Sequence, residues 1–232
     1  MTVRDHYLVA GAKPWNRRVF DDAISRYPGI WHFIERPGQL TVESLRVLAP
    51  RYIFFLHWSW RVPLEIITQY ECVCFHMTDV PYGRGGSPLQ NLIVRGHRHT
   101  KLTALRMVED FDAGPFYMKE DLCLEGRAEE IYEQASELSA QMIRRIISEQ
   151  PNPEPQVGEP TFFMRRKPEE SRIPELYSAQ ALYDFVRMLD AEGYPHAFLE
   201  HSGFLYEFTR AAMSDEGITA MVKIRSVEKP NP

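Results

Sequence analysis

Apolar residues recur along this chain in two patterns, as short continuous runs and as longer stretches with helical spacing. Short apolar runs bounded by glycine, proline or polar clusters are typical of buried strands. They predict strands at residues 6–11, 31–35, 52–56, 72–77, 102–108 and 116–124. Helical spacing predicts helices at residues 16–27, 42–48, 63–70, 89–94 and 128–149. Strands that alternate with helices of this size predict an α/β, Rossmann-like fold with right-handed crossovers and a mainly parallel sheet.

The composition changes after residue 150. The stretch PNPEPQVGEP, residues 151–160, holds four prolines and predicts an extended connection. Beyond it, the patterns predict a strand at residues 162–166, an amphipathic helix at 178–190, a hairpin at 196–209 and a last strand at 218–224. We therefore expect a main domain at residues 1–150, followed by a linker and a small C-terminal helix-and-strand subdomain at residues 151–232.

Composition and charge narrow the class of protein. The net charge of -5 and the pI near 5.9 argue against a nucleic-acid binder, which usually carries a basic face. No stretch approaches the roughly 20 apolar residues of a membrane span, so we expect a cytoplasmic protein with no membrane partner. Cys72, Cys74 and Cys123 are an odd number and predict no disulfide framework, only reduced core thiols. His97 and His99 lie in a polar turn without supporting ligands, so no metal site is predicted.

Candidate chemistry gathers in the loop after the predicted strand at residues 72–77. That strand ends at His76, and a loop rich in glycine and proline follows. Asp112 lies in an Asp-Ala-Gly turn about one strand further along the chain. Because reactive groups of an open parallel sheet collect at the carboxyl ends of its strands, we expect neighbouring strand ends to bring His76 and Asp112 together. An imidazole paired with a carboxylate suits proton transfer near neutral pH.

The same residues resemble a known family, the folate-dependent formyltransferases. The pattern reads His76, Pro81, Arg84-Gly85 and Pro88, with Asp112-Ala113-Gly114-Pro115 downstream. The loop HWSWRVP, residues 57–63, resembles the folate-side loop of that family. The resemblance covers roughly residues 5–166 and is greatest to the small formyltransferases of pseudaminic acid biosynthesis.

This resemblance implies an enzyme that uses 10-formyltetrahydrofolate. It implies that the acceptor is the amine of a nucleotide-linked amino sugar, such as a UDP-linked 4-amino-4,6-dideoxy sugar. The acidic charge balance adds the expectation that no nucleic acid takes part. His76 and Asp112 match the histidine and aspartate of the family's catalytic group. The family's asparagine two residues before the histidine is replaced by Cys74, which is a weak hydrogen-bond donor. Asn91 is the candidate replacement for that donor, with a surface or helix-packing role as the alternative.

The resemblance also implies binding residues. For the cofactor they are Trp58, Trp60, Val62, Asp110 and Phe111. For the substrate they are Tyr82, Arg84 and Ser87. The alternative for the tryptophans is that they cover a sheet edge, and the alternative for Arg84 is that it holds its own loop.

Two other functions are open to this sequence. The first is formylation of an aminoacyl group on tRNA or on a peptide-synthetase carrier, against which the acidic balance and the short tail count. The second is a degenerate protein that binds folate or a sugar nucleotide without turnover. The presence of both His76 and Asp112 argues against the second, because a pure binder needs no proton-transfer pair.

Overall fold

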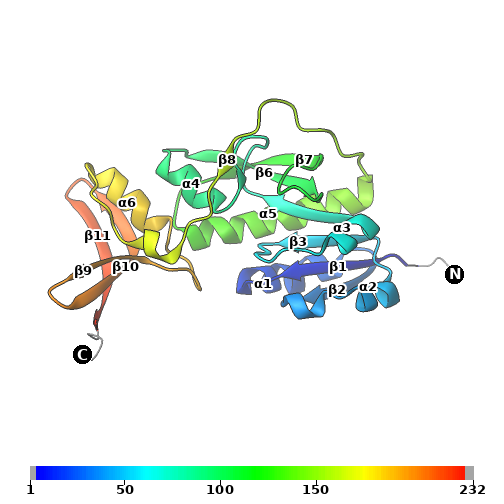
Figure 1. Ribbon diagram of the computed structural model, residues 1–232, viewed down its shortest axis with the longest axis horizontal. Coiled ribbons are helices and arrows are strands. Elements are labelled where there is room, and N and C mark those ends of the chain that lie inside the picture. Colours follow the sequence, from blue (N-terminus) through cyan, green and yellow to red (C-terminus); the bar gives the residue numbers. More distant parts are fainter. Residues whose placement is uncertain (1–3, 228–232) are drawn as a thin grey trace. The chain divides into compact units, whose positions relative to one another are not determined.

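Six strands form the central sheet in the order β2-β1-β3-β4-β6-β7 (Figure 1). The structure is a computed structural model, and it describes residues 4–227. Strands β2, β1, β3 and β4 pair in parallel, which confirms the predicted α/β fold with a mainly parallel sheet. The six strands are β1 (His6–Gly11), β2 (Ile30–Ile34), β3 (Tyr52–Leu56), β4 (Cys72–His76), β6 (His99–Arg106) and β7 (Phe116–Cys123).

Strand β6 breaks the parallel pattern. It runs antiparallel to β4, with Thr103 opposite His76 and Arg106 opposite Val73. The end of β6 therefore lies beside the start of β4, and the Met107 amide donates to the Cys72 carbonyl at 2.8 Å. The expectation that His76 and Asp112 follow two parallel strands is thus wrong, because β6, the strand before Asp112, starts rather than ends at the edge where His76 lies.

Two short helices cover one face of the sheet. They are α2 (Val42–Leu48) and α3 (Leu64–Gln69), whose Leu45 and Ile66 are buried against apolar side chains of β1 and β3. Helix α2 begins after Thr41 as predicted, because the Thr41 hydroxyl oxygen accepts a hydrogen bond from the Ser44 amide at 3.1 Å. The predicted helix at 63–70 is present with Pro63 as its N-cap.

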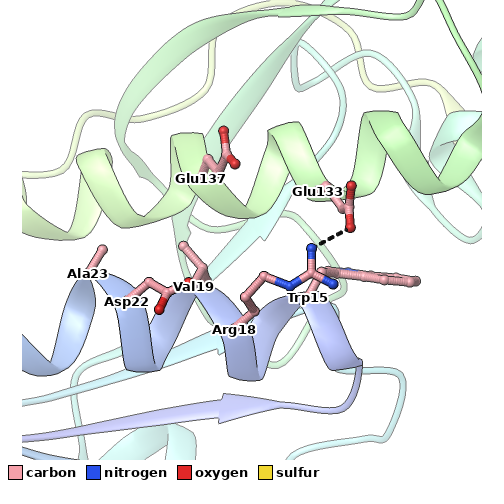
Figure 2. Close-up of a pocket in the computed structure, with 7 residues that line it drawn as sticks. All are labelled: Trp15, Arg18, Val19, Asp22, Ala23, Glu133 and Glu137. Carbon is pink, nitrogen blue, oxygen red and sulfur yellow. Dashed lines mark hydrogen bonds and ion pairs between the residues drawn. The ribbon is translucent and has the colours of Figure 1, made fainter.

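Two longer helices lie side by side in Figure 2, α1 (Pro14–Asp22) and α5 (Ala128–Glu149). The Asn16 side-chain amide on α1 donates to the Ser136 hydroxyl on α5 at 2.9 Å, a buried contact. Phe20 of α1 packs against Phe33, which points to the opposite face from Ile34 because side chains alternate along β2. Helix α5 has the predicted bounds, whereas the predicted helix at 16–27 ends at Asp22 and is followed by a 3-10 turn, η1 (Ile24–Arg26).

The C-terminal part of the chain forms a three-stranded antiparallel sheet in the order β11-β10-β9. Helix α6 packs against β10 and against α4, and Ser178 caps it by accepting from the Ala181 amide at 3.1 Å. The predicted hairpin and last strand are both present. The elements are α4 (Pro88–Val94), α6 (Ala179–Arg187), β9 (Ala197–His201), β10 (Phe204–Ser214) and β11 (Gly217–Ser226). The shorter elements are β5 (Arg84–Gly85), β8 (Phe162–Phe163), η2 (Pro37–Gln39) and η3 (Pro168–Ser171).

The chain divides into two compact units. The first unit contains residues 1–85, 100–122 and 132–162, and the second contains residues 86–99, 123–131 and 163–232. The chain therefore passes between the units several times, whereas the sequence predicted a single boundary after residue 150. Among residues 4–227, no helix has the length and apolar character needed to cross a membrane.

Candidate active site

His76 lies at the end of β4, and both of its ring nitrogens face hydrogen-bond acceptors. Its Nε2 is 2.9 Å from the carbonyl oxygen of Gly83, and its Nδ1 is 3.5 Å from Oδ1 of Asp112. A carbonyl oxygen only accepts hydrogen bonds, so Nε2 carries a hydrogen and donates to Gly83. The Nδ1–Asp112 separation is longer than a normal hydrogen bond. The structure therefore brings His76 and Asp112 together as predicted.

Asp112 reaches His76 because the segment after β6 turns back along β4. Its backbone has a φ of 54°, in the left-handed region. Its second carboxylate oxygen, Oδ2, accepts a hydrogen bond from the Gly85 amide at 2.9 Å. Two residues later the turn passes so close to β6 that a Cβ on Gly114 would lie 1.8 Å from the Arg106 carbonyl oxygen. Only glycine fits there, which explains the Asp-Ala-Gly sequence.

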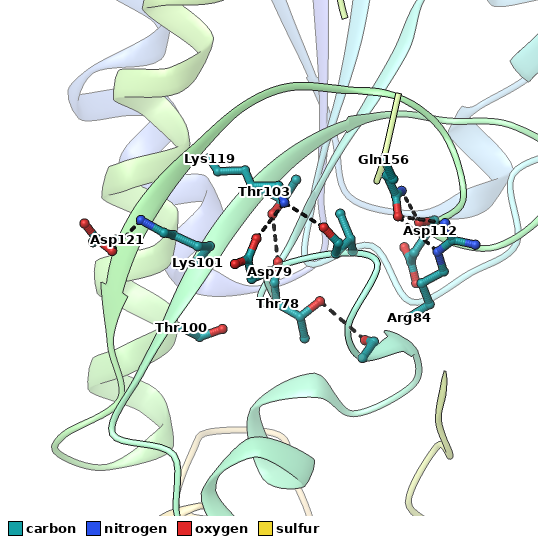
Figure 3. Close-up of polar contacts among 12 residues, drawn as sticks. Thr78, Asp79, Arg84, Thr100, Lys101, Thr103, Asp112, Lys119, Asp121 and Gln156 are labelled. Carbon is teal, nitrogen blue, oxygen red and sulfur yellow. Dashed lines mark hydrogen bonds and ion pairs between the residues drawn. The ribbon is translucent and has the colours of Figure 1, made fainter. Parts of the chain in front are cut away.

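Polar side chains of β6 and β7 hold the start of the loop after β4, as Figure 3 shows. The Thr103 hydroxyl donates to the Thr78 carbonyl oxygen at 2.7 Å. The Lys119 ammonium contacts Oδ1 of Asp79 at 2.5 Å and the Val80 carbonyl oxygen at 2.6 Å. These contacts fix the loop that supplies the partner of His76 Nε2.

Gln156 fixes the other end of this loop. Its Oε1 accepts hydrogen bonds from Nε and Nη2 of Arg84 at 3.1 and 2.8 Å. Its Nε2 donates to the carbonyl oxygens of Asp112 and Gly114, both at 2.7 Å. These contacts favour the alternative in which Arg84 holds its own loop. No sequence signal identified Gln156, because the four prolines of residues 151–160 predict only an extended connection.

Asn91 and Ser87 belong to the second unit, where both make backbone contacts. Nδ2 of Asn91 lies 3.0–3.2 Å from the carbonyl oxygens of Gly86, Ser87 and Met164. An amide has two hydrogens, so this side chain is committed to packing α4 against its own unit, which favours the helix-packing alternative. The Ser87 hydroxyl oxygen accepts from the Arg166 amide at 3.0 Å. Tyr82 is half-buried in the first unit.

The aromatic loop after β3 contains an unusual donor. The ring of Trp58 packs edge-on against Phe55 and Trp60, with centroid distances of 5.9 and 4.9 Å. The Trp58 Nε1 is buried and has no acceptor among the described residues. Buried donors are nearly always paired in native proteins, by protein groups, water or a ligand, so this indole N–H can accommodate an acceptor from outside the chain.

The other predicted cofactor residues are divided between core and surface. Val62 is buried in the core beneath α2 and α3. Phe111 is 67% exposed, with the guanidinium carbon of Arg61 6.0 Å from its ring centroid. Asp110 is also exposed and begins the turn that leads to Asp112.

Two other titratable groups beside the site are held uncharged. Burial lowers the pKa of His57 to about 3, and its Nδ1 accepts a hydrogen bond from Trp15 Nε1 at 3.4 Å. Burial, and after it the charge of Asp112, raise the pKa of the Cys74 thiol well above its usual range. Cys74 is therefore a protonated thiol rather than a nucleophile.

A pocket between α1 and α5 lies away from these residues (Figure 2). An ion pair between Arg18 and Glu133, 2.8 Å apart, crosses it. None of the predicted site residues lines it. The lining residues are Trp15, Arg18, Val19, Asp22, Ala23, Glu133 and Glu137.

Known proteins share both the sequence and the fold of this chain. A solved structure of methionyl-tRNA formyltransferase from Clostridium thermocellum is 42% identical and superposes with a TM-score of 0.91. The match covers 96% of this chain and 99% of that chain. The chain belongs to the formyltransferase family.

Other matches agree with this family. The family model "Methionyl-tRNA formyltransferase, C-terminal domain" matches residues 168–225. The methionyl-tRNA formyltransferase of Thermodesulfovibrio yellowstonii is 27% identical over 154 residues, which are 63% of this chain and 50% of that protein. The chain thus spans about half the length of this curated relative. HypX from Aquifex aeolicus, solved in complex with tetrahydrofolic acid, shares the fold with a TM-score of 0.76 at 18% identity, over 98% of this chain and 45% of that chain.

Family membership confirms some predictions from the sequence and corrects others. The predicted class, a folate-dependent formyltransferase that uses 10-formyltetrahydrofolate, is confirmed at the level of the family. The predicted nucleotide-sugar substrate and pseudaminic acid pathway are wrong, because the 42% identical structure is a methionyl-tRNA formyltransferase. Sugar N-formyltransferases match at only 12–17% identity, which shows the fold alone. The expectation that no nucleic acid takes part is wrong for the same reason. It rested on the net charge of the chain, whereas binding of phosphates depends on local positive charge.

Proposed function

We propose that this chain transfers the formyl group of 10-formyltetrahydrofolate to the amine of a methionyl group carried by tRNA. The observation that carries the proposal is the 42% identity to the Clostridium thermocellum methionyl-tRNA formyltransferase over nearly the whole of both chains. The match of residues 168–225 to a C-terminal domain of that enzyme class supports the same acceptor.

The residues around His76 suit this reaction. 10-Formyltetrahydrofolate supplies the formyl group: the amine nitrogen bonds to the formyl carbon as the bond from that carbon to folate N10 breaks, and a proton passes from the amine to N10. An N–H of the His76 ring donates to the formyl oxygen and stabilises the negative charge that develops there. Its Nδ1 is 3.5 Å from Asp112, longer than a normal hydrogen bond, so this N–H is available to the reacting oxygen. Asp112 receives the proton of the amine and passes it on to N10.

The loop after β3 suits the folate. Trp58 offers a buried indole N–H that has no acceptor among residues 4–227, and Trp60 and Phe111 present rings that are 45% and 67% exposed. A pterin ring carries hydrogen-bond acceptors and has aromatic faces, so it matches both features. Val62 and Asp110 would border the same site, on its core side and its solvent side.

Local charge is compatible with a tRNA acceptor. The second unit carries three consecutive basic residues, Arg165, Arg166 and Lys167. Arg165 is exposed and forms no ion pair within residues 4–227. Exposed arginines of this kind bind phosphates whatever the net charge of the chain.

The decisive experiment is a formylation assay. The protein is incubated with 10-formyltetrahydrofolate and methionyl-tRNA, and the methionyl group is released and weighed by mass spectrometry. We expect a gain of one formyl group, and little gain on a tRNA charged with valine. No gain on methionyl-tRNA, with a donor that a known formyltransferase can use, overturns the proposal.

A further inference from the structure

Gln156 is the one side chain of the Pro-rich segment at 151–160 that makes four hydrogen bonds at the candidate active site (Figure 3). Its two amide hydrogens go to the carbonyl oxygens of Asp112 and Gly114, and its oxygen accepts two hydrogen bonds from Arg84. The orientation of the amide is unambiguous, because a guanidinium only donates and a carbonyl only accepts. Every donor and acceptor of this side chain is therefore used.

The turn that Gln156 holds is one that needs support. The backbone of Asp112 is in the left-handed region, which is unfavourable for a residue other than glycine. Gln156 donates hydrogen bonds to the carbonyl oxygens of Asp112 and Gly114, so it fixes the first and last residues of the Asp-Ala-Gly turn. The Asp112 carboxylate is then directed at His76 on one side and at the Gly85 amide on the other.

We propose that Gln156 is a positioning residue, which holds the Asp112 turn so that the Asp112 carboxylate faces His76. The proposal rests on the proposed formyl transfer for its catalytic consequence. Gln156 touches neither reacting group and acts through the backbone of Asp112. Its contact with Arg84 ties the loop after β4 to the same side chain, so the two segments that carry the catalytic pair are joined at one amide.

A simpler role is that Gln156 only anchors Arg84. The Gln156→Glu variant separates the two roles. A carboxylate keeps the acceptors that Arg84 uses and adds an opposite charge, but it lacks the two N–H donors and faces two carbonyl oxygens. The anchoring role predicts that Gln156→Glu works as well as the wild type. The positioning role predicts that it fails as Gln156→Ala does.

The first test is kinetic. We expect Gln156→Ala and Gln156→Glu each to lower kcat by roughly 10–100-fold with KM for the folate nearly unchanged, because displacement of a catalytic group by about 1 Å costs on that scale. Glu154→Ala is the matched control, since this exposed residue lies in the same segment and its side chain forms no hydrogen bond or ion pair among residues 4–227. If Gln156→Glu keeps kcat within about threefold of the wild type, the positioning role is overturned.

The second test needs no activity. Hydrogen exchange of the Gly85 amide reports the Asp112 contact, whereas that of the Gly83 amide reports a hydrogen bond to the Thr161 hydroxyl, 2.8 Å away, which Gln156 does not touch. We expect Gln156→Ala to speed exchange at Gly85 and to leave Gly83 unchanged. Equal rates at Gly85 in the wild type and the variant overturn the proposal. If the wild type formylates no methionyl-tRNA, the proposed function fails, while the exchange at Gly85 still decides the role of Gln156.

Discussion

The loops that follow β3 and β4 are neighbours in the parallel part of the sheet, yet they are held in different ways. The loop after β4 is fixed by hydrogen bonds that Thr103 and Lys119 donate to it and by hydrogen bonds that it donates to Thr161 and Gln156. The loop after β3 is held mainly by aromatic packing, and its Trp58 indole N–H has no acceptor within residues 4–227.

This difference matches the two tasks that we propose for the loops. Proton transfer and charge stabilisation depend on groups whose positions are set before the substrate arrives, which polar contacts achieve. A ligand site must keep donors free for the ligand, and an unpaired buried N–H is such a donor. In the loop after β4 the polar groups are thus paired without a ligand. In the loop after β3 a ligand would pair the free indole N–H.

The largest effect is expected from removing the charge of Asp112. The Asp112→Asn variant keeps the side-chain size but loses the carboxylate that faces His76, so formyl transfer should fall by about 10² or more. His76→Ala should lose as much. Asp121→Asn, at a surface carboxylate that is 89% exposed, is the control. Turnover within about tenfold of wild type, with an unchanged circular dichroism spectrum, contradicts the proposed pair.

The next largest effect is expected from acid, which should lower the free energy of unfolding through His57, at the start of the loop after β3. Burial lowers the pKa of His57 to about 3, so the folded protein disfavours the charged ring. In the unfolded chain the pKa of histidine is about 6.5, so this contribution to stability is complete above that pH. It is lost by roughly 1.4 kcal/mol per pH unit as the pH falls from about 6.5 towards 3.

Urea denaturation at a series of pH values measures this loss. The slope of the unfolding free energy against pH should be smaller in His57→Phe than in the wild type. His32 needs a separate control, His32→Phe, because burial also lowers its pKa and acts in the same direction. Equal slopes for wild type and His57→Phe would show that His57 is not buried as a neutral ring.

The Trp58→Phe variant tests the unpaired donor in the same loop. If the indole N–H binds the folate, its loss should weaken binding of a folate analogue by about tenfold, the value of one hydrogen bond to a ligand. The free protein should be as stable as the wild type or more stable, because a buried unpaired donor is removed. Calorimetric titration and thermal melting measure the two effects. Unchanged affinity would assign Trp58 to packing alone.

The smallest effect is expected at Cys74, which lies in β4 next to both loops. Its thiol is protonated, because burial and the charge of Asp112 raise its pKa, and a thiol is a weak donor. Cys74→Ala should therefore keep formyl transfer within about tenfold of the wild type. A hundredfold loss of formyl transfer in a folded variant would show that the thiol takes part in the reaction. The thiol, rather than His76, would then be the main oxyanion donor.

Local patterns in the sequence determined most of the secondary structure. The helix at Ala128–Glu149 has the predicted bounds because its apolar spacing is long and regular, and the strand at Tyr52–Leu56 has them because its apolar run is continuous. Thr41 indicated the start of α2, because its hydroxyl accepts a hydrogen bond from the amide of Ser44, only three residues away in the chain. His76 and Asp112 were found from their neighbours in the chain, since the Gly- and Pro-rich turns around them are local features.

Tertiary structure decided how the site is assembled. The antiparallel direction of β6 depends on pairing between β4 and residues about 30 positions later, which no local pattern reveals. Gln156 reaches Asp112 across 44 residues, so its role is invisible in a segment that reads as a connection. The commitment of Asn91 to three carbonyl oxygens, one of them 73 residues away, could likewise be seen only in the folded chain. Hydrogen bonds between distant residues depend on where the backbone places their partners, and that placement is a property of the whole fold.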